Sequence, residues 1–581
     1  MREAMALRAA IAATRYDEAG MTDALADMDA ISPGSGYGYA TAGHFLAGNR
    51  QYDLAARALR EAIRRESGWA TPQIDLGLML VQAARDDEAR QVLGRVAELD
   101  PFNEAARFSL KLLNDISAYA VIETPHFVIR YDPQTTDGLL AEEMKAPLEK
   151  IHADITGVFG HEPAQKTVIE LQPNHARFAV RITGMPELHT IAASTGPLIA
   201  VESPRAGAGH FGLFDWARVV RHEYVHTVNL SHTNNRIPHW LTEAAAVWQE
   251  SAPRDERTCL MLAQAYETDR LFDLDEINWA FVRPKRAGDR GLAYAQGHWM
   301  FEYMVETFGL DRMRALMGEY AKGQAEAAAL PAALGVTREA FFEGFMAWAP
   351  GELEKWGYHA LPTMDVMLAE IHGEQIPPSL SAEDVDGLLE RYPSHPDLLE
   401  AKIEMLQAGE GLTEALVPWL QRYSAARPAA MVPHELQAQL LLNEGQGAEA
   451  IAHLEELDRR EQYRPLFAVE LASQYRGQGQ YQEALAKMRR ALGIDPFNAT
   501  FRELAAAIAI QAKDFAEARR HITALTVLEP DRLIHTQRLE ALGALEAKAA
   551  PPLDDCGGTE RGEDDAVSVC AVPSASECRD S

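Results

Sequence analysis

A repeat of 34 residues at both ends of the chain constrains the fold more than any other feature. Near the N-terminus, small and turn-forming residues recur at this spacing: Gly43 and Gly77, Ala55 and Ala89, Ala62 and Val96, Ser67 and Pro101. The same phase returns near the C-terminus: Ala450, Ala484 and Ala518, with Pro428, Gln462, Pro496 and Pro530. A period of this length predicts pairs of short helices stacked into two arrays.

The residue types in the repeat fit this prediction. Small residues let the two helices of a unit approach closely, and a proline after the second helix begins the next unit without losing a helical hydrogen bond. The stretches QYDLAARALREAI, QYQEALAKMRRALGIDPFN and DFAEARRHITALTVLEPD resemble the tetratricopeptide (TPR) family. We therefore assign 1–118 and 380–545 to all-α TPR solenoid arrays, which would offer concave surfaces to a protein partner.

Between the arrays the pattern changes to short runs rich in β-branched residues, closed by turn formers. These runs are 126–132, 166–173 and 197–204, and helical patterns follow from 214 to 348. Strands followed by helices predict an α+β domain, placed at 119–360. Within it, Leu198–Val201 could be an edge strand that pairs with a substrate backbone or a core strand of the sheet. Both interpretations stay open.

Two further segments and the cysteines complete the organisation. Several Pro and Gly residues predict a linker at 361–379, and the lack of periodicity with little apolar content predicts a disordered acidic tail at 546–581. The four cysteines are Cys259, Cys556, Cys570 and Cys578. Three lie in the tail without a close pair, so neither a disulfide framework nor a cysteine metal site is predicted.

The bulk composition excludes several classes of function. An apolar fraction of 47% with 24% charged residues is typical of a globular protein. The net charge of −31 would repel nucleic acids and anionic lipids, and no apolar run reaches the length of a membrane span. Arg2, Glu3 and Arg8 interrupt the N-terminal segment, so it is not predicted to be a signal peptide. Localisation stays unknown, with the cytoplasm as the default, because an upstream segment could be missing.

The chemistry is concentrated in His222-Glu223-Tyr224-Val225-His226. The surrounding apolar residues have helical spacing, and positions four apart share one helix face. His222 and His226 can therefore bind one zinc ion, with Glu223 beside them as the general base for a zinc-activated water. The sequence thus predicts a zinc metallopeptidase site.

Two residues compete to be the third metal ligand. His232 completes HEYVHTVNLSH, which has the histidine spacing of metzincin peptidases, with Asn229 where that family has Gly. Glu243 lies in IPHWLTEAAAVWQE, on a helix that Pro238 would start and that Ala244–Ala246 would let pack closely. The first choice would give three histidines and the second a His₂Glu set with one open position.

The wider sequence resembles one of these classes. HEYVHTVNL and NNRIPHWLTEAAAVW are similar to the gluzincin peptidases, especially the peptidase MA-like domains found beside TPR arrays. The resemblance implies a zincin-type α+β domain between the two arrays. It also implies one zinc ion held by His222, His226 and Glu243, with His232 a loop residue.

Two departures from the family pattern bear on the site. Val247 stands where some relatives have an Asp that orients a ligand histidine, so another residue must take that role or it is absent. The Gly-x-Met-Glu-Asn motif of the aminopeptidase branch is missing, which favours an endopeptidase.

One downstream residue is predicted to stabilise the oxyanion, and one alternative function stays open. Tyr294, in AYAQGHW, is the candidate to stabilise the oxyanion, with His298 as the fallback, because relatives often place a Tyr or His there. The arrays would hold a peptide or protein substrate. The alternative is a TPR scaffold for protein interaction whose zinc domain is catalytically silent.

Overall fold

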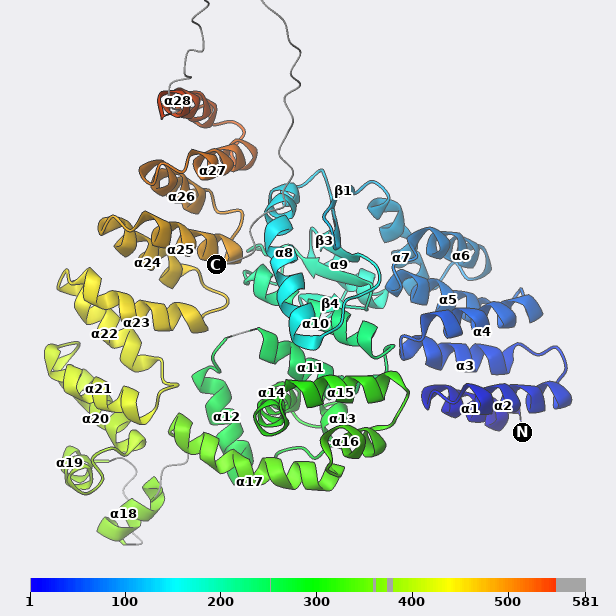
Figure 1. Ribbon diagram of the computed structural model, residues 1–581, viewed down its shortest axis with the longest axis horizontal. Helices are drawn as coiled ribbons and strands as arrows, with labels where there is room; N and C mark the ends of the chain where they lie inside the picture. Colours follow the sequence, from blue (N-terminus) through cyan, green and yellow to red (C-terminus); the bar gives the residue numbers. More distant parts are fainter. Residues whose placement is uncertain (1, 251, 359–361, 374–379, 550–581) are drawn as a thin grey trace, which may run out of the picture.

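The computed structural model describes residues 2–250, 252–358, 362–373 and 380–549. A central domain with a small sheet lies between two helical arrays, formed by the N-terminal and the C-terminal parts of the chain (Figure 1). The cysteines of the predicted tail and most of the tail itself, 550–581, lie outside the described residues. Among the described residues, every helix is either too short or too polar to cross a membrane.

The N-terminal array consists of paired antiparallel helices. They are α1 (Arg2–Thr14), α2 (Glu18–Ile31), α3 (Tyr37–Gly48), α4 (Tyr52–Arg65), α5 (Ala70–Gln82), α6 (Asp86–Leu99) and α7 (Glu104–Ile116). The backbone follows the 34-residue period, since the turn inside each pair places Tyr16, Arg50 and Ala84 in the left-handed region. A Cβ at Gly77 would lie 2.4 Å from Leu93 Cδ2, so the close approach expected at the small residues is present.

The C-terminal array continues the same architecture. Its elements are α18 (Met364–His372), α19 (Ala382–Arg391), α20 (Pro396–Glu410), η1 (Glu414–Leu416), α21 (Val417–Ala426), α22 (Val432–Asn443), α23 (Gly447–Arg460), α24 (Leu466–Gly477), α25 (Tyr481–Ile494), α26 (Ala499–Gln511), α27 (Phe515–Leu528) and α28 (Ile534–Ala549). Left-handed residues again recur every 34 positions, at Gly445, Gly479 and Lys513. The predicted linker differs from the structure because it contains α18, whose Met367 is buried in the core of this array.

The central sheet has the strand order β1-β2-β3-β5-β4. Its strands are β1 (Ala120–Glu123), β2 (Phe127–Tyr131), β3 (Thr167–Gln172), β4 (Ala192–Ser194) and β5 (Leu198–Glu202). The pairs β2–β3 and β3–β5 are parallel, whereas β1 and β4 run antiparallel to their neighbours at the two edges. The three predicted strands correspond to β2, β3 and β5. The edge interpretation of Leu198–Val201 was wrong, because the short strand β4 covers β5 and forms the edge itself.

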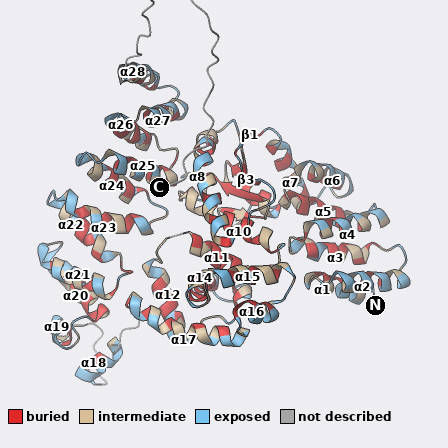
Figure 2. Cartoon of the chain, in the orientation of Figure 1, coloured by how far each residue is buried: buried red, intermediate tan, exposed pale blue. Residues whose placement is uncertain are grey.

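Helices complete the central domain: some form a layer on each face of the sheet, and the others extend away from it (Figure 1). They are α8 (Asp137–Phe159), α9 (His175–Thr183), α10 (Trp216–His232), α11 (His239–Gln249), α12 (Glu256–Glu267), α13 (Ile277–Val282), α14 (Asp289–Phe308), α15 (Leu310–Ala321), α16 (Glu326–Leu334) and α17 (Arg338–Trp356). Alternate residues of β5 serve the two layers: Ile199 and Val201 join the core with α8 and α10, whereas Leu198 and Ala200 pack on Phe178 of α9. The central strands β3 and β5 and helix α10 are therefore among the most buried parts of the molecule (Figure 2).

Ion pairs attach the central domain to the N-terminal array. Arg181 of α9 is fully buried, donates a hydrogen bond to Asp86 at 2.8 Å and forms an ion pair with Glu170 of β3 at 3.0 Å. Arg130 of β2 bonds the second oxygen of Asp86 at 2.6 Å. Because a buried charge needs a partner of opposite sign, these contacts favour docking of the array against the sheet.

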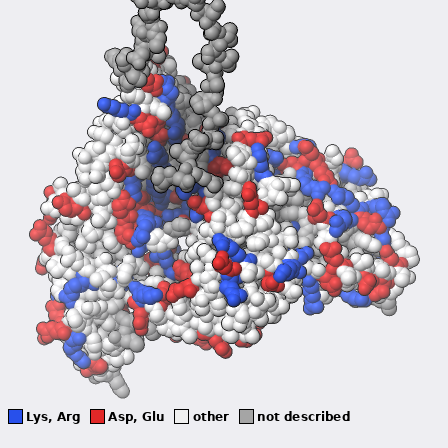
Figure 3. All heavy atoms as spheres, viewed as in Figure 1, with Lys and Arg blue, Asp and Glu red and all other residues white. Residues whose placement is uncertain are grey.

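The C-terminal array contacts the central domain at the start of α10. Asp215 caps this helix, pairs with Arg490 of α25 and donates its backbone N–H to Gln462 O at 3.0 Å. Arg502 of α26 pairs with Glu143 of α8. Between these contacts lies a hollow of about 1020 Å³ lined by α8, α10, α25 and α27. Figure 3 shows Lys and Arg side chains gathered where the C-terminal array faces the central domain.

Candidate metal centre

Helix α10 carries the HExxH segment in a rigid, buried setting. The Asp215 side chain accepts hydrogen bonds from the N–H groups of Ala217 and Arg218, which caps the helix. Trp216 and Val220 anchor it in the core, and the helix then runs unbroken to His232. The five residues of the motif therefore span about one and a half turns of a fixed helix, with both histidines on one face.

The side chains of His222, His226 and Glu243 converge on one point. The two Nε2 atoms are 3.2 Å apart, and Glu243 Oε2 lies 3.5 Å from His222 Nε2 and 3.4 Å from His226 Nε2. Glu243 reaches this point from α11, where Ala244–Ala246 are fully buried and let the two helices pack closely. The three form a group whose ligand atoms could hold a metal ion.

The carboxylate of Glu243 shows that a cation fits here. Its Oε2 atom is buried and has no hydrogen-bond partner among the described residues, although it is the atom that faces both imidazoles. Burial lowers the pKa of His222, but the carboxylates of Glu243 and Glu250 outweigh burial and raise it well above its ordinary value. A buried carboxylate without a partner is costly, and a metal ion between these three donors would remove that cost.

The outer ring nitrogens of both histidines are held by residues that the sequence did not single out. Glu250 Oε1 lies 2.7 Å from His222 Nδ1, and Thr242 Oγ1 lies 2.8 Å from His226 Nδ1. Such partners fix the ring orientation and leave Nε2 free to bind a metal. Glu250 thus stands in for the acidic residue missing at Val247. The sequence did offer one signal for Glu250: it comes seven residues, or about two helical turns, after Glu243, and so lies on the same side of the helix.

Comparison with known proteins agrees with this geometry. Residues 210–349 match the Peptidase MA superfamily. The resemblance to peptidase MA-like domains is thereby confirmed, whereas membership of the gluzincin group stays a prediction. Residues 475–542 match the tetratricopeptide repeat, which confirms the TPR resemblance. No curated protein matches the chain.

Solved structures similar to the chain include three helical proteins. YrrB, a TPR protein with an unusual peptide-binding site, is 14% identical, with a TM-score of 0.23, over 29% of this chain and 87% of that chain. The Cut9–Hcn1 hetero-tetramer of the APC/C is 12% identical, with a TM-score of 0.21, over 93% and 96%. Yeast Tom70 is 12% identical, with a TM-score of 0.20, over 95% and 98%.

Glu223 and Tyr294 flank the triad of the Peptidase MA domain. Glu223 is 8% exposed, and burial raises the pKa of its carboxyl group. Tyr294 projects from α14 with its ring edge-on to Phe281 at 4.8 Å. Burial and the nearby charges of Glu243 and Glu223 raise the pKa of its phenol, so it stays a hydrogen-bond donor. The base and the oxyanion donor predicted from the sequence thus lie beside the same triad.

The rival ligand His232 does not reach this centre. A metzincin-like turn would have to leave the helix at Asn229, but that residue is helical and buried, and the left-handed residues come later, at Asn234 and Asn235. His232 instead stacks on His161 with ring centroids 4.7 Å apart. The choice of Glu243 over His232 therefore agrees with the geometry.

Two other histidines of the central domain, His298 and His239, have different neighbours from those of the triad histidines. His298, the fallback for the oxyanion role, contacts Glu302 at 3.3 Å and Arg254 at 3.4 Å. His239 lies at the rim, with Nε2 3.6 Å from Glu243 Oε1. Cys259 is a free, buried thiol in the core.

Proposed function

We propose that this chain is a zinc-dependent metallopeptidase of the gluzincin type, and an endopeptidase. The observation that carries the proposal is the convergence of His222, His226 and Glu243 around one buried point, where Glu243 Oε2 has no hydrogen-bond partner within the described part of the chain. These three residues would hold one zinc ion. When bound there, zinc acts as a Lewis acid that polarises the scissile carbonyl and acidifies water.

The remaining residues supply the proton transfers and the orientation. Hydrolysis forms a C–O bond to water and breaks the C–N bond of the peptide. Glu223 takes a proton from the attacking water and passes it to the leaving amine, so the products are a carboxylate and an amine. Tyr294 donates a hydrogen bond to the carbonyl oxygen as negative charge develops on it. Glu250 and Thr242 hold the two imidazoles in place.

The edge strand β4 is the proposed binding site for an extended substrate. It packs against α10, where Ser194 Oγ lies 2.9 Å from Thr227 Oγ1. On one side β4 pairs with β5, and on the other it has no strand partner among the described residues. An extended peptide can pair with such an edge through its backbone. The TPR arrays would recruit the protein that carries this peptide or a separate partner.

Glu223→Gln tests the proposal. Because the metal ligands stay in place and only the base is lost, zinc content should be unchanged while peptide hydrolysis falls by about 10²–10⁴-fold. Zinc is measured by elemental analysis, and cleavage is measured on a peptide library with the full chain. Glu302→Gln, the same change at a carboxylate that faces His298 and not a triad histidine, is the matched control and should keep both.

Two results would contradict the proposal. Undiminished cleavage by Glu223→Gln would remove Glu223 from the mechanism. Zinc bound by the wild-type chain without cleavage of any peptide would favour the alternative, a TPR scaffold with a catalytically silent zinc domain.

A further inference from the structure

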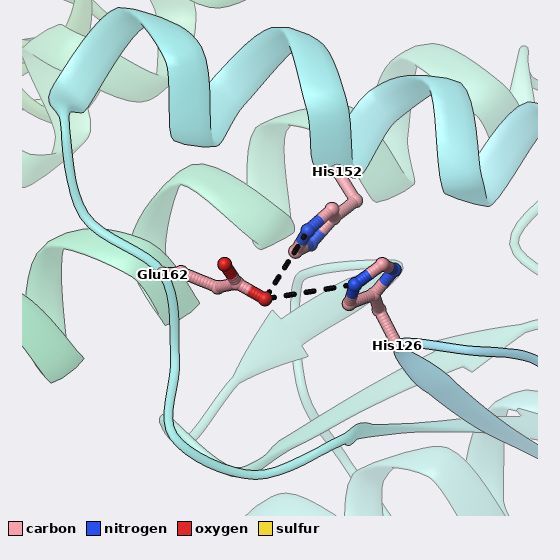
Figure 4. A group of neighbouring side chains, drawn as sticks. All are labelled: His126, His152 and Glu162. Carbon is pink, nitrogen blue, oxygen red and sulfur yellow. Dashed lines mark ion pairs between the residues drawn. The ribbon is translucent and has the colours of Figure 1, made fainter. Parts of the chain in front are cut away.

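A second group of two histidines and one glutamate lies away from the HExxH site. His126 comes just before β2, His152 lies on α8, and Glu162 lies in the loop after α8 (Figure 4). Glu162 Oε1 is 3.5 Å from His126 Nε2 and 3.8 Å from His152 Nε2. The three residues come from separate segments, yet their ligand atoms gather at one place.

As in the Glu243 triad, the Nδ1 atom of each histidine ring has its own hydrogen-bond partner. His126 Nδ1 lies 2.5 Å from Glu149 Oε2, and the backbone N–H of His126 donates to Glu149 Oε1 at 3.1 Å. His152 Nδ1 lies 2.7 Å from the hydroxyl oxygen of Tyr224. With the ring protons on Nδ1, donated to these partners, both Nε2 lone pairs are free on the side of Glu162. This is the arrangement that metal-binding histidines usually have.

The distances suit a small transition-metal ion. Ligand atoms about 2.0–2.1 Å from a tetrahedral zinc ion are roughly 3.4 Å from one another. The carboxylate-to-imidazole distances of 3.5 and 3.8 Å are close to that separation. The two rings stack with centroids 3.6 Å apart, and since an imidazole binds a metal near its own plane, binding would splay the rings. Two imidazoles and one carboxylate favour zinc-class ions over Mg²⁺ or Ca²⁺.

A third group of this kind lacks these properties. Glu503, Glu529 and His535 also lie within reach of one another. However, Glu503 pairs with Arg538 at 3.0 Å, and Glu529 pairs with Arg532 at 2.8 Å. Because arginines already neutralise both carboxylates, we expect this group to bind a cation more weakly.

We propose that His126, His152 and Glu162 form a second site for a zinc-class divalent ion, on the side of α10 opposite the Glu243 triad. Tyr224, which contacts His152, shows on which side of α10 the site lies. It comes two residues after His222 and therefore points about 200° around the helix from it. The bound ion would tie β2, α8 and the loop after α8 together and, through His152 and Tyr224, brace α10 from behind. Glu162 is well exposed, so the ion can enter from solvent.

Metal counting on the full chain tests this proposal. The protein is stripped with a chelator, reloaded with Zn²⁺, dialysed, and its zinc per chain measured. His126→Ala and Glu162→Gln should each remove one zinc relative to the wild type, and Glu243→Gln should remove a different one. Since Glu162 is exposed, Glu162→Gln does not endanger folding. Titration with Co²⁺ should show Glu162→Gln weakening the site by more than about 100-fold, beyond the usual effect of losing an outer-shell partner.

The matched control is His453→Ala. His453 Nδ1 lies 3.2 Å from His434 Nδ1, so the two form another histidine pair. Among the described residues, no carboxylate joins this pair to form a group that could hold a metal. This variant should keep the wild-type zinc content. Equal zinc in His126→Ala, Glu162→Gln and the wild type would overturn the second site. Loss in His126→Ala but not in Glu162→Gln would overturn the three-ligand site as well. Neither result bears on the Glu243 triad, so the two proposals fail separately.

Discussion

Two groups with the same donors, two imidazoles and one carboxylate, flank one helix but differ in their surroundings. The Glu243 triad lies between α10 and α11, and its carboxylate side chain is 9% exposed. The carboxylate of Glu162 comes from a loop and is 62% exposed. Glu223 and Tyr294 lie beside the first group, whereas the second is flanked by Glu149 and Tyr224, which bond the rings themselves.

This difference shows that a ligand set does not by itself make a hydrolytic site. Hydrolysis needs a base whose oxygens are not already bonded to a ligand and a donor aimed at the developing oxyanion. At the Glu162 group the nearest carboxylate, Glu149, is occupied by the ring and backbone N–H groups of His126. We therefore expect catalysis only at the Glu243 triad and a structural role for the Glu162 group.

Tyr294→Phe should have the largest effect among the variants that separate the two groups. Deleting the phenol oxygen removes the proposed oxyanion donor and keeps the ring against Phe281, so kcat should fall by about 10²–10³-fold. Zinc content should not change. The measurement is steady-state peptide cleavage alongside elemental analysis. Tyr303→Phe deletes the same atom from the same helix within the aromatic core and should keep kcat within a few fold. Equal kcat in the two variants would exclude Tyr294 from the chemistry.

Glu250→Gln should have an intermediate effect, on zinc affinity at the Glu243 triad. The amide keeps the shape of the side chain but loses the charge that orients His222, and losing such a partner costs about 10–100-fold in affinity. Competition with a chromophoric chelator measures the change. Glu302→Gln, which faces His298 instead of a triad histidine, is the control and should leave the affinity unaltered. An unchanged affinity in Glu250→Gln would show that Glu250 does not hold the ligand.

The parts of the molecule with strong periodicity could be predicted from the sequence. The 34-residue repeat recurs in the structure as left-handed turn residues from Tyr16 to Ala84 and from Gly445 to Lys513. The helices that carry His222 and Glu243 could be predicted because four-residue spacing and a proline start are local signals. The short strands β1 and β4 were missed, since runs of three or four residues carry too little pattern.

The rest of the site depended on long-range packing that no local pattern records. His126, His152 and Glu162 lie on a strand end, a helix and a loop, so only the folded domain brings them together. Glu250 is the exception, because it shares a helix face with Glu243. The position of Leu198–Val201 inside the sheet could not be predicted. The strand that separates it from the sheet edge, β4, has too few residues to recognise in the sequence.

Tyr224→Phe should give the smallest effect and tests whether the two groups are linked through α10. In a His222→Ala background, where the Glu243 triad is disabled, Co²⁺ binding reports the Glu162 group alone. Removing the hydroxyl deprives His152 Nδ1 of its partner at 2.7 Å, and losing one outer-shell hydrogen bond should weaken binding by about tenfold. Tyr303→Phe in the same background is the control and should bind Co²⁺ as the parent does. A Tyr224→Phe affinity equal to that of the parent would mean that His152 is oriented without α10, and the second ion would then brace only β2, α8 and the loop that carries Glu162.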